Sequence, residues 1–364
     1  MKILMVNSAS SSVMYFRRDL IKSLRRLGHK IVLITADSDF QEEIQQLCDK
    51  RYVINVHNRS TNVFKSIYYF NRVRAITRAE KPDVVFTFQA KPNTLGVLGA
   101  KKYCSNIYSM IEGLGDVFIK ETVTWRIVRK ILRLMYRISL KKANKVFFLN
   151  SDDKDYFLNN RLVKTNQIVQ IDGIGINLDS FPFKEVSNFN TILMVARLLK
   201  SKGVIEYCEA AKIVKNQGYQ YNFILIGSES ELSSRDIKEY TDFNYITYLG
   251  FQKNVKSIIE ESTIFVLPSY REGLPISTLE AMAIGRPIIT TNAVGCKDTI
   301  IDAYNGFVVA IGDANDIADK VIKLMSDRDK IIHYGKNGRK MTEDKFNQIN
   351  INKKITDIIL EKTN

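Results

Sequence analysis

Short apolar runs alternate with longer amphipathic stretches along this chain, and the series starts twice. In the first half the runs predict strands at residues 2–6, 30–35, 52–56, 83–88, 107–111 and 145–149, with helices between them such as 14–27 and 61–79. In the second half they predict strands at residues 191–195, 221–226, 245–249, 263–267 and 287–290. Such alternation is typical of βα units and parallel sheets. We therefore expect an α/β protein with two doubly wound, Rossmann-like domains facing across a cleft, with ligand at the carboxyl ends of the strands.

Size and composition agree with a soluble protein of two domains. The chain has 364 residues, of which 45% are hydrophobic and 26% charged. Its four cysteines are far apart and form no C-x-x-C pair, which argues against a zinc site or a disulfide framework and favours a reducing cytoplasm. The apolar run at residues 3–6 is too short for a signal peptide, and no run approaches the roughly 18 apolar residues that a membrane span needs.

The excess positive charge lies entirely in the first half. Residues 1–184 hold 31 Lys and Arg against 16 Asp and Glu, whereas the remaining residues hold 23 of each. Such asymmetry indicates that one half faces a polyanion, either nucleic acid or an acidic membrane. The chain has no aromatic–basic nucleic-acid recognition motif and its second half is neutral, so we expect no nucleic-acid partner.

The most informative segment is residues 269–288, which follows a predicted strand. Glu272 and Glu280 are eight residues apart there, across a Gly-Leu-Pro break. Pro275 suits the first position of a helix, so the segment reads as strand, loop and helix start. Unpaired N–H groups at a helix start attract phosphate oxygens, and carboxylates accept hydrogen bonds from sugar hydroxyls. A nucleotide-sugar carries both kinds of group.

This segment resembles the Glu-x7-Glu signature of the retaining, two-Rossmann (GT-B) glycosyltransferases of family 4. The likeness extends over Glu272-Gly-Leu-Pro275, Glu280-Ala-Met-Ala-x-Gly-x-Pro287 and Asn305-Gly306. It implies that Glu272 contacts the transferred sugar and supports the transition state, and that Glu280 binds the ribose hydroxyls. The amides of Gly273 and Leu274 would face the diphosphate or the sugar.

Two further passages resemble the donor site of that family. Met194-Val-Ala-Arg-Leu-Leu-Lys-Ser-Lys-Gly203 is similar to its Gly-Arg-Leu-x-x-x-Lys-Gly, which implies that Arg197 and Lys202 clasp the donor diphosphate. Ala196 stands where the family usually has glycine. Leu249-Gly-Phe251 resembles a turn against the nucleobase and would place Phe251 there, although it reads equally well as a plain strand end. Two cations can stabilise the departing diphosphate, so we expect neither a metal ion nor a cofactor.

The resemblance also sets the expected domains. The passage from Ile171 to Phe181 is similar to the family's connection between domains, with Asn177 where aspartate is usual. We expect an N-terminal acceptor- and membrane-facing domain at residues 1–175 and a C-terminal donor domain at residues 176–345. The resemblance implies that a last helix, residues 346–364, crosses back to the first domain.

The acceptor side is read from two loops of the first half. Ser11 lies in a serine-rich loop that replaces the family's glycine pair beside the donor phosphates, or that only caps the following helix. Glu112 lies in the segment Met110-Ile-Glu-Gly-Leu-Gly-Asp-Val-Phe118. This segment resembles a passage of the transferases that build bacterial surface polysaccharides, including N-acetylhexosamine transferases. Glu112 would hold the donor sugar, help to deprotonate the acceptor, or serve structure alone; Asp116 is the alternative.

A basic helix is predicted over residues 120–145, whose single acid is Glu121. Its cations include Lys120 and, at three- or four-residue steps, Arg126, Arg129, Lys130, Arg133 and Arg137. Its apolar residues are expected to pack mostly into the core: Ile127, Val128, Ile131, Leu132, Met135 and Ile138. The cationic stripe would face phosphate on an anionic membrane, and the helix at residues 14–27, which holds Arg17 and Arg18, would add to the same field.

Together these features predict a retaining glycosyltransferase at the inner face of the cell membrane, peripheral and cytoplasmic. It would move a sugar, best an N-acetylhexosamine from a UDP donor, onto a polyprenyl-diphosphate-linked acceptor in bacterial surface polysaccharide or glycan synthesis. A soluble or protein acceptor is the alternative. A UDP-N-acetylglucosamine 2-epimerase shares the two-Rossmann plan but lacks the combination of Arg-x4-Lys with Glu-x7-Glu.

Overall fold

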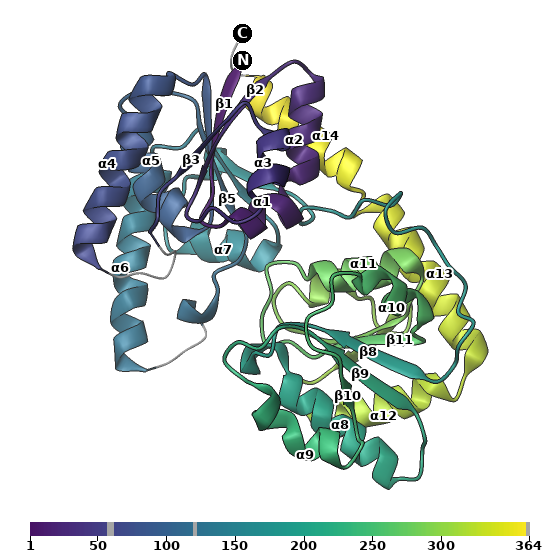
Figure 1. Ribbon diagram of the computed structural model, residues 1–364. Helices are drawn as coiled ribbons and strands as arrows, with labels where there is room; N and C mark the ends of the chain where they lie inside the picture. The colour runs from purple at the N-terminus through teal and green to yellow at the C-terminus, as the bar shows by residue number, and fades with distance from the viewer. Residues whose placement is uncertain (57–61, 119–121, 362–364) are drawn as a thin grey trace. The chain divides into compact units, whose positions relative to one another are not determined.

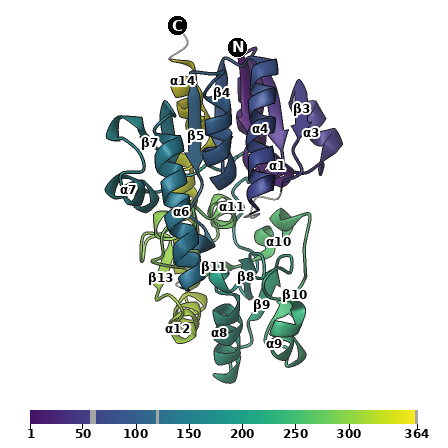
Figure 2. The same ribbon diagram turned by 90° about the vertical axis from the view of Figure 1, so that its left-hand side faces the viewer.

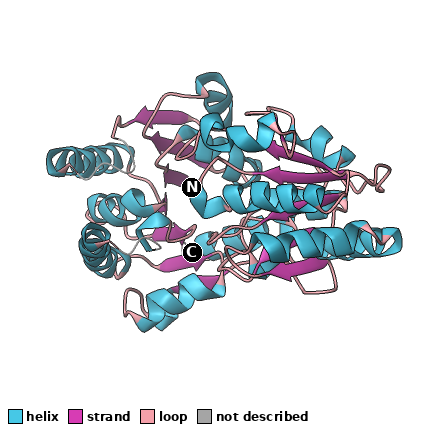
Figure 3. Ribbon diagram, turned by 90° about the horizontal axis from the view of Figure 1, so that it is seen from below, coloured by secondary structure: helices cyan, strands magenta, loops and turns pink. Residues whose placement is uncertain are grey.

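The computed structural model describes residues 1–56, 62–118 and 122–361. The expected helix start at Thr61, Lys120 and Glu121 of the basic helix, and residues 362–364 lie outside this range. The chain divides into two compact units, one formed by residues 1–174 with 350–364 and the other by residues 175–349. In both units helices flank the strands (Figure 3).

Unit 1 is built on a seven-stranded parallel sheet in the order β3-β2-β1-β4-β5-β6-β7. Its strands are β1 (Lys2–Val6), β2 (Lys30–Thr35), β3 (Lys50–Val53), β4 (Val84–Phe88), β5 (Ile107–Ile111), β6 (Lys145–Phe148) and β7 (Ile168–Gln170). The central strands are buried almost throughout, as a parallel sheet covered on both faces requires. The strand order reverses between β1 and β4, so the topological switch point of the unit lies at the carboxyl ends of these two strands.

Helices cover both faces of this sheet. They are α1 (Ser10–Phe16), α2 (Arg18–Arg26), α3 (Gln41–Leu47), α4 (Val63–Glu80), α5 (Val97–Ala100), α6 (Val123–Leu140), α7 (Ser151–Asn159) and the C-terminal α14 (Gln348–Leu360), with short helical turns η1 (Pro92–Gly96), η2 (Asp116–Phe118) and η3 (Thr165–Gln167). Figures 1 and 2 place α4, α5 and α6 on one face, and Figure 1 places α2, α3 and α14 on the other. The apolar side chains between these layers form the core of the unit.

Unit 2 repeats the plan with a six-stranded parallel sheet in the order β10-β9-β8-β11-β12-β13. Its strands are β8 (Thr191–Val195), β9 (Asn222–Ile226), β10 (Thr247–Tyr248), β11 (Ile264–Leu267), β12 (Ile288–Thr291) and β13 (Gly306–Val309). The order reverses between β8 and β11. The expected α/β class with two doubly wound parallel sheets is thus confirmed.

The helices of unit 2 also form two layers. They are α8 (Val204–Asn216), α9 (Lys238–Asp242), α10 (Val255–Glu261), α11 (Ile276–Ile284), α12 (Ala314–Met325) and α13 (Arg328–Asp344), with short turns η4 (Lys200–Lys202), η5 (Ser234–Ile237) and η6 (Lys297–Thr299). Helix α8 packs against α12, and α11 packs against α10 and α13. Between these layers lies a second apolar core.

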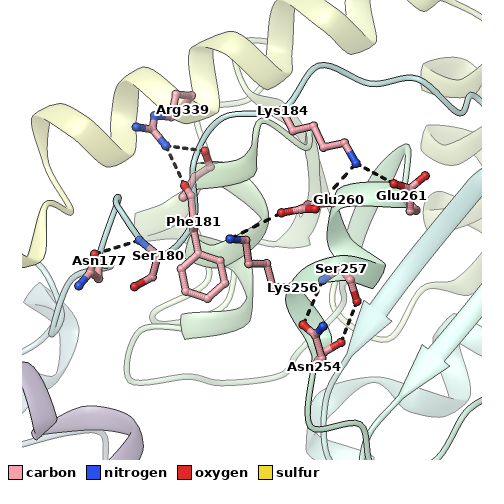
Figure 4. A network of polar contacts seen from close by, with 11 residues as sticks. Asn177, Ser180, Phe181, Lys184, Asn254, Lys256, Ser257, Glu260, Glu261 and Arg339 are labelled. Atoms are coloured by element: carbon pink, nitrogen blue, oxygen red, sulfur yellow. Dashed lines mark hydrogen bonds and ion pairs between the residues drawn. The ribbon is translucent and has the colours of Figure 1, made fainter.

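Polar contacts fasten the first segment of unit 2 to its helices (Figure 4). The Asn177 side chain accepts hydrogen bonds from the backbone N–H groups of Asp179 and Ser180, both at 3.1 Å, so asparagine caps this turn as aspartate would. Arg339 donates to the carbonyls of Phe181 and Ala283, at 2.9 Å each. This segment is therefore a fixed part of unit 2.

Two sequence expectations about helices need correction. The helix expected over residues 14–27 is broken at Arg17, whose φ of −123° separates α1 from α2. Pro275 is the N-cap of α11 rather than its first helical residue, because its ψ of 110° is extended.

Candidate active site

The candidate donor site lies at the switch point of unit 2, where the loops after β8 and β11 begin. The β8 loop carries Arg197 and leads into η4, whose last residue is Lys202. The β11 loop carries Ser269 and Glu272 and leads into α11. Neighbouring parallel strands with reversed order leave a crevice at their carboxyl ends, which is where open α/β sheets bind ligands.

Lys202 and Glu272, 70 residues apart in sequence, form an ion pair at this edge. The same carboxylate oxygen, Glu272 Oε1, accepts a hydrogen bond of 2.8 Å from the Ser269 hydroxyl. Both charged side chains are mostly but not fully covered. The pair therefore places a fixed cation and a fixed carboxylate side by side, with access for a ligand.

Close backbone packing holds these two loops together. Gly203 has φ +73°, and a Cβ there would lie 2.2 Å from the Pro268 carbonyl oxygen. Gly295 has φ +80°, and its Cβ would lie 2.5 Å from the Glu272 carbonyl oxygen. The Tyr270 N–H also donates to the Ser201 carbonyl at 2.9 Å. Only glycine fits such approaches, so the backbone sets the positions of Lys202 and Glu272.

The remaining residues predicted for the donor site differ in exposure. Glu280 lies in α11 with its carboxyl group largely shielded, and desolvation raises its pKa to about 7. Leu274 is buried and Gly273 half-buried in the loop before α11, whereas Arg197 is exposed after β8. Phe251 is 62% exposed after β10, so its ring is open to a ligand rather than part of the core.

In unit 1, Glu112 occupies the equivalent edge, directly after β5. Its Oε1 forms an ion pair with Arg17, and its Oε2 accepts a hydrogen bond of 2.7 Å from Gln89 Nε2. Arg17 is completely buried, and its guanidinium lies 4.3 Å from the centre of the Phe88 ring. Burial lowers the pKa of Arg17, and the Glu112 carboxylate supplies the opposite charge that such a buried cation requires.

Arg17 and Gln89 are the residues that sequence reasoning missed. Arg17 is one of five cations in its stretch and looks no different from the exposed Arg18. The break between α1 and α2, which turns Arg17 inward, has no Gly or Pro to announce it. Gln89 has φ +68°, a conformation that a glutamine in sequence does not signal.

The serine-rich loop is partly committed to its own structure. The Ser10 N–H donates to both carboxylate oxygens of Asp37, at 3.2 Å each, and the Ser12 hydroxyl donates to the Ala9 carbonyl at 2.8 Å. Ser11 is exposed between them on α1. The side chain of Asp116, the alternative to Glu112, is not among those the structure describes.

The basic helix α6 differs from expectation in both of its stripes. Arg129 donates to the Val117 carbonyl at 3.1 Å, Arg133 bonds to the Asn160 side chain, and Arg137 donates to the Asn160 carbonyl at 3.1 Å. Arg126 and Lys130 lie exposed. These bonds show that part of the cationic stripe holds the helix to its own unit.

The apolar stripe of α6 was expected mostly in the core, and for half of its residues this is wrong. Leu132 packs against the core of unit 1, but Ile127, Ile131 and Ile138 are each about half exposed. They form one row with two further exposed residues, Val123 and Leu134. The helix packs on η1 and η2, and the side chains of this row stay exposed among the described residues of unit 1.

The expectation that α2 and α6 form one cationic field is also wrong. The two helices cover opposite faces of the unit 1 sheet (Figure 1), and Arg17 is not on the surface.

Among the described residues, no three His, Cys, Asp or Glu side chains come together in a way that could hold a metal ion.

Comparison with known proteins identifies the family. Residues 17–172 match Glycosyltransferase Family 4, and residues 176–341 match Glycosyl transferases group 1. The chain is 30% identical to the N,N'-diacetylbacillosaminyl-diphospho-undecaprenol alpha-1,3-N-acetylgalactosaminyltransferase of Campylobacter jejuni, with 93% of each chain covered. The chain belongs to the family 4 glycosyltransferases.

Other relatives support the family and the GT-B fold. The transferase is 26% identical to the capsular polysaccharide biosynthesis glycosyltransferase CapM of Staphylococcus aureus, over 95% of its own length and 93% of the relative's. A glycosyltransferase structure from Rickettsia africae matches with a TM-score of 0.81 at 21% identity, covering 99% of this chain and 98% of the other. Anabaena HepE in complex with UDP and glucose matches with a TM-score of 0.79 at 16% identity, covering 99% and 100%.

Proposed function

We propose that this glycosyltransferase moves an N-acetylhexosamine from a UDP donor onto a polyprenyl-diphosphate-linked acceptor in bacterial surface polysaccharide or glycan synthesis. The observation that carries the donor half is the Lys202–Glu272 pair at the switch point of unit 2. The acceptor half is supported by the Campylobacter relative, whose name specifies an undecaprenyl-diphosphate-linked acceptor and an N-acetylgalactosaminyl group. In this proposal residues 176–345 form the donor domain and residues 1–175 the acceptor- and membrane-facing domain.

The donor would be held by charge at one end and by hydrogen bonds at the other. Arg197 and Lys202 contact the diphosphate, Glu280 accepts hydrogen bonds from the ribose hydroxyls, and Phe251 lies against the base. The amides of Gly273 and Leu274 face the diphosphate or sugar, and Ser11 supplies a further hydroxyl. When a phosphate oxygen arrives, Lys202 exchanges part of its contact with Glu272 for the diphosphate, which frees the carboxylate for the sugar.

Chemistry with retention follows from the same groups. The acceptor hydroxyl attacks from the face that the diphosphate leaves, and the departing phosphate oxygen takes the hydroxyl proton. Negative charge grows on the leaving group as its bond to the sugar breaks, and Arg197 and Lys202 stabilise it. Two such cations supply the neutralisation that a divalent metal provides elsewhere, so the reaction needs no metal ion.

We further propose that the enzyme works at the inner face of the cell membrane, bound to anionic lipid. Among the described residues no helix is long and apolar enough to cross a bilayer. Helix α6 instead presents its exposed apolar row, with Arg126, Lys130 and Arg137 each one position before a residue of that row. Successive helical positions are about 100° apart, so the cations line one edge of the row. An apolar row with a cationic edge fits a helix lying in a membrane interface.

The N-terminal turn of α4 extends this surface. Phe64 is 83% exposed, and Ile67 and Tyr68 on the same helix are half exposed. Helices α4 and α6 both pack on η1 and cover the same face of the sheet (Figure 2). A bilayer would cover these side chains. The lipid-linked acceptor is anchored in the same bilayer.

The transfer reaction is tested with a panel of labelled nucleotide-sugars and bacterial membrane lipid extract as acceptor. Label is expected in the butanol-soluble fraction with the UDP-N-acetylhexosamine donor, including in the presence of EDTA. Glu272→Ala should abolish it, whereas Glu185→Ala, an exposed carboxylate of the same unit, should not. Label that stays in the aqueous phase with a folded, UDP-binding protein would reject the lipid acceptor.

Membrane binding is tested by sedimentation with vesicles of equal parts phosphatidylglycerol and phosphatidylcholine. Replacing Ile127 and Ile131 together by serine should weaken binding at least tenfold, because each buried isoleucine contributes about 1.5–3 kcal/mol. The matched control replaces Phe243 and Ile301 by serine, two apolar side chains of unit 2 that are 70% and 54% exposed. Equal binding by both double variants would show that the α6 row does not enter the membrane.

A further inference from the structure

Unit 1 has a linked set of side chains at its own switch point, which the assignments above leave without a defined role. Ser8, Gln89 and Glu112 follow β1, β4 and β5, three neighbouring strands of the sheet. The Ser8 N–H donates to Gln89 Oε1 at 2.9 Å, and Gln89 Nε2 donates to Glu112 Oε2 at 2.7 Å. The chain of bonds ends at Arg17, which pairs with the other oxygen of Glu112.

This arrangement costs folding free energy. Arg17 is a fully buried cation, and Gln89 holds a left-handed φ of +68° that residues with a Cβ rarely adopt. Desolvation of a buried ion pair offsets most of its attraction, and strained backbone of this kind gathers at functional sites. An apolar residue would fill the space over Phe88 more cheaply than Arg17 does. The cluster is therefore better explained by a function of Glu112 than by stability.

The geometry defines what Glu112 can do. One of its carboxylate oxygens forms an ion pair with Arg17 and the other accepts a hydrogen bond from Gln89, and the side chain is 18% exposed, so one edge is open to solution. A carboxylate held beside a buried guanidinium is a poor proton acceptor, because protonation would leave the guanidinium without its counter-charge. The same carboxylate is a strong hydrogen-bond acceptor, with lone pairs that its two partners do not use.

We propose that Arg17 and Gln89 position Glu112 as the acceptor of a hydrogen bond from a sugar hydroxyl or amide N–H, and that Glu112 does not take the acceptor proton. This inference rests on the proposed transfer reaction and narrows the role of Glu112 within it. The sugar belongs either to the donor or to the lipid-linked acceptor. Arg17 and Gln89 act through Glu112 and are positioning residues.

The test compares steady-state kinetics of the wild-type enzyme with Glu112→Gln and Gln89→Ala, using the UDP-sugar and lipid extract identified by the transfer assay. Glutamine keeps one acceptor oxygen but cannot serve as a base. We expect KM for one substrate to rise about tenfold, with kcat changed much less, since a hydrogen bond to a charged group is weakened. A rise in the donor KM assigns the contact to the donor sugar, and a rise in the acceptor KM assigns it to the acceptor sugar.

Three results would overturn the inference. One is a fall in kcat of about 100-fold or more at unchanged KM, the signature of a lost general base. Another is an acid limb in the wild-type pH–rate profile that disappears in Glu112→Gln. The third is unchanged KM and kcat in both variants. A wild-type enzyme that transfers no sugar would instead reject the reaction itself.

If Glu112→Gln fails to fold, a second variant tests the same inference. Because Glu112→Gln leaves Arg17 buried without its counter-charge, the double variant Arg17→Met with Glu112→Gln removes both charges and keeps side-chain volume over Phe88. The same KM and kcat criteria apply to it. Arg18→Met, which removes the neighbouring exposed cation, is the control and should match the wild type.

Discussion

Glu272 and Glu280 belong to one motif, but the fold gives them different environments. Glu272 pairs with Lys202 and is held by Ser269, so it enters the reaction already oriented. No ion pair of Glu280 is found among the described residues, and shielding by α11 and its neighbours raises its pKa to about 7. A ribose hydroxyl that donates to Glu280 would give this shielded carboxylate a polar partner. The two carboxylates therefore differ most before ligand binds.

The raised pKa of Glu280 makes the stability of the unliganded protein depend on pH. The folded state binds this proton more tightly than the unfolded state, so the stabilisation is complete below the ordinary pKa of 4.5 and is lost as pH rises through about 7. Between about pH 5 and pH 8 the free energy of unfolding should fall by at most about 3 kcal/mol on this account. Glu280→Gln should remove that part of the slope in urea unfolding, and Glu185→Gln should leave it. Equal slopes in Glu280→Gln and wild type would contradict the prediction.

At the scale of elements, the sequence predicted central strands better than edges. The strands at residues 2–6, 30–35, 107–111 and 191–195 have the expected bounds, because both faces of a central parallel strand are covered and the whole run is apolar. β7 and β13 lie at sheet edges and were not predicted, and β3 starts at Lys50, two residues before the expected strand. Edge strands take their register from one neighbour, which a single hydrophobic pattern does not reveal.

Helix α6 and Arg17 illustrate what hydrophobic patterns cannot decide. The row containing Ile127 and Ile131 has the periodicity of a core face, yet it lies exposed in the part of unit 1 that the structure describes. Arg17 is of a residue type that is usually found on the surface, yet it is buried and forms an ion pair with Glu112. A pattern indicates which side chains share a face. Which face finds a partner is set by neighbouring elements distant in sequence, such as η1 and β5.

The η4 turn offers a direct test of how an element positions a side chain. Gly203 and Gly218 both have positive φ, but a Cβ at Gly203 would meet the Pro268 carbonyl at 2.2 Å and one at Gly218 would meet nothing within 4 Å. Gly218→Ala should therefore cost only the left-handed penalty of about 1–2 kcal/mol and leave UDP binding unchanged. Gly203→Ala should cost more and weaken UDP binding, because it displaces Lys202. Urea unfolding and calorimetric titration with UDP measure both effects, and equal values for the two variants would show that the close approach does not position Lys202.

For the molecule as a whole, the two units repeat one architecture but differ in how the chain completes them. Unit 2 is continuous, whereas unit 1 is completed by residues from the end of the chain. Helix α14 contributes the buried Ile351, Ile355 and Ile359, and Lys354 donates to the Gln170 carbonyl of β7 at 2.9 Å. Unit 1 therefore lacks a covering helix until the last residues are present.

This completion predicts that damage to α14 destabilises one unit selectively. Ile355 is 2% exposed and Ile349, on the same helix, is 69% exposed. Ile355→Asp buries a charge without a partner and should cost about 3 kcal/mol or more, whereas Ile349→Asp should be close to neutral. Hydrogen exchange followed by mass spectrometry should show strands β1 to β6 losing protection in Ile355→Asp while β8 to β13 keep theirs. Loss of protection in both sheets together would mean that the two units unfold as one cooperative body. Retained UDP binding in the same variant would separate this outcome from damage to the donor site, because Lys202, Glu272 and Glu280 all belong to unit 2.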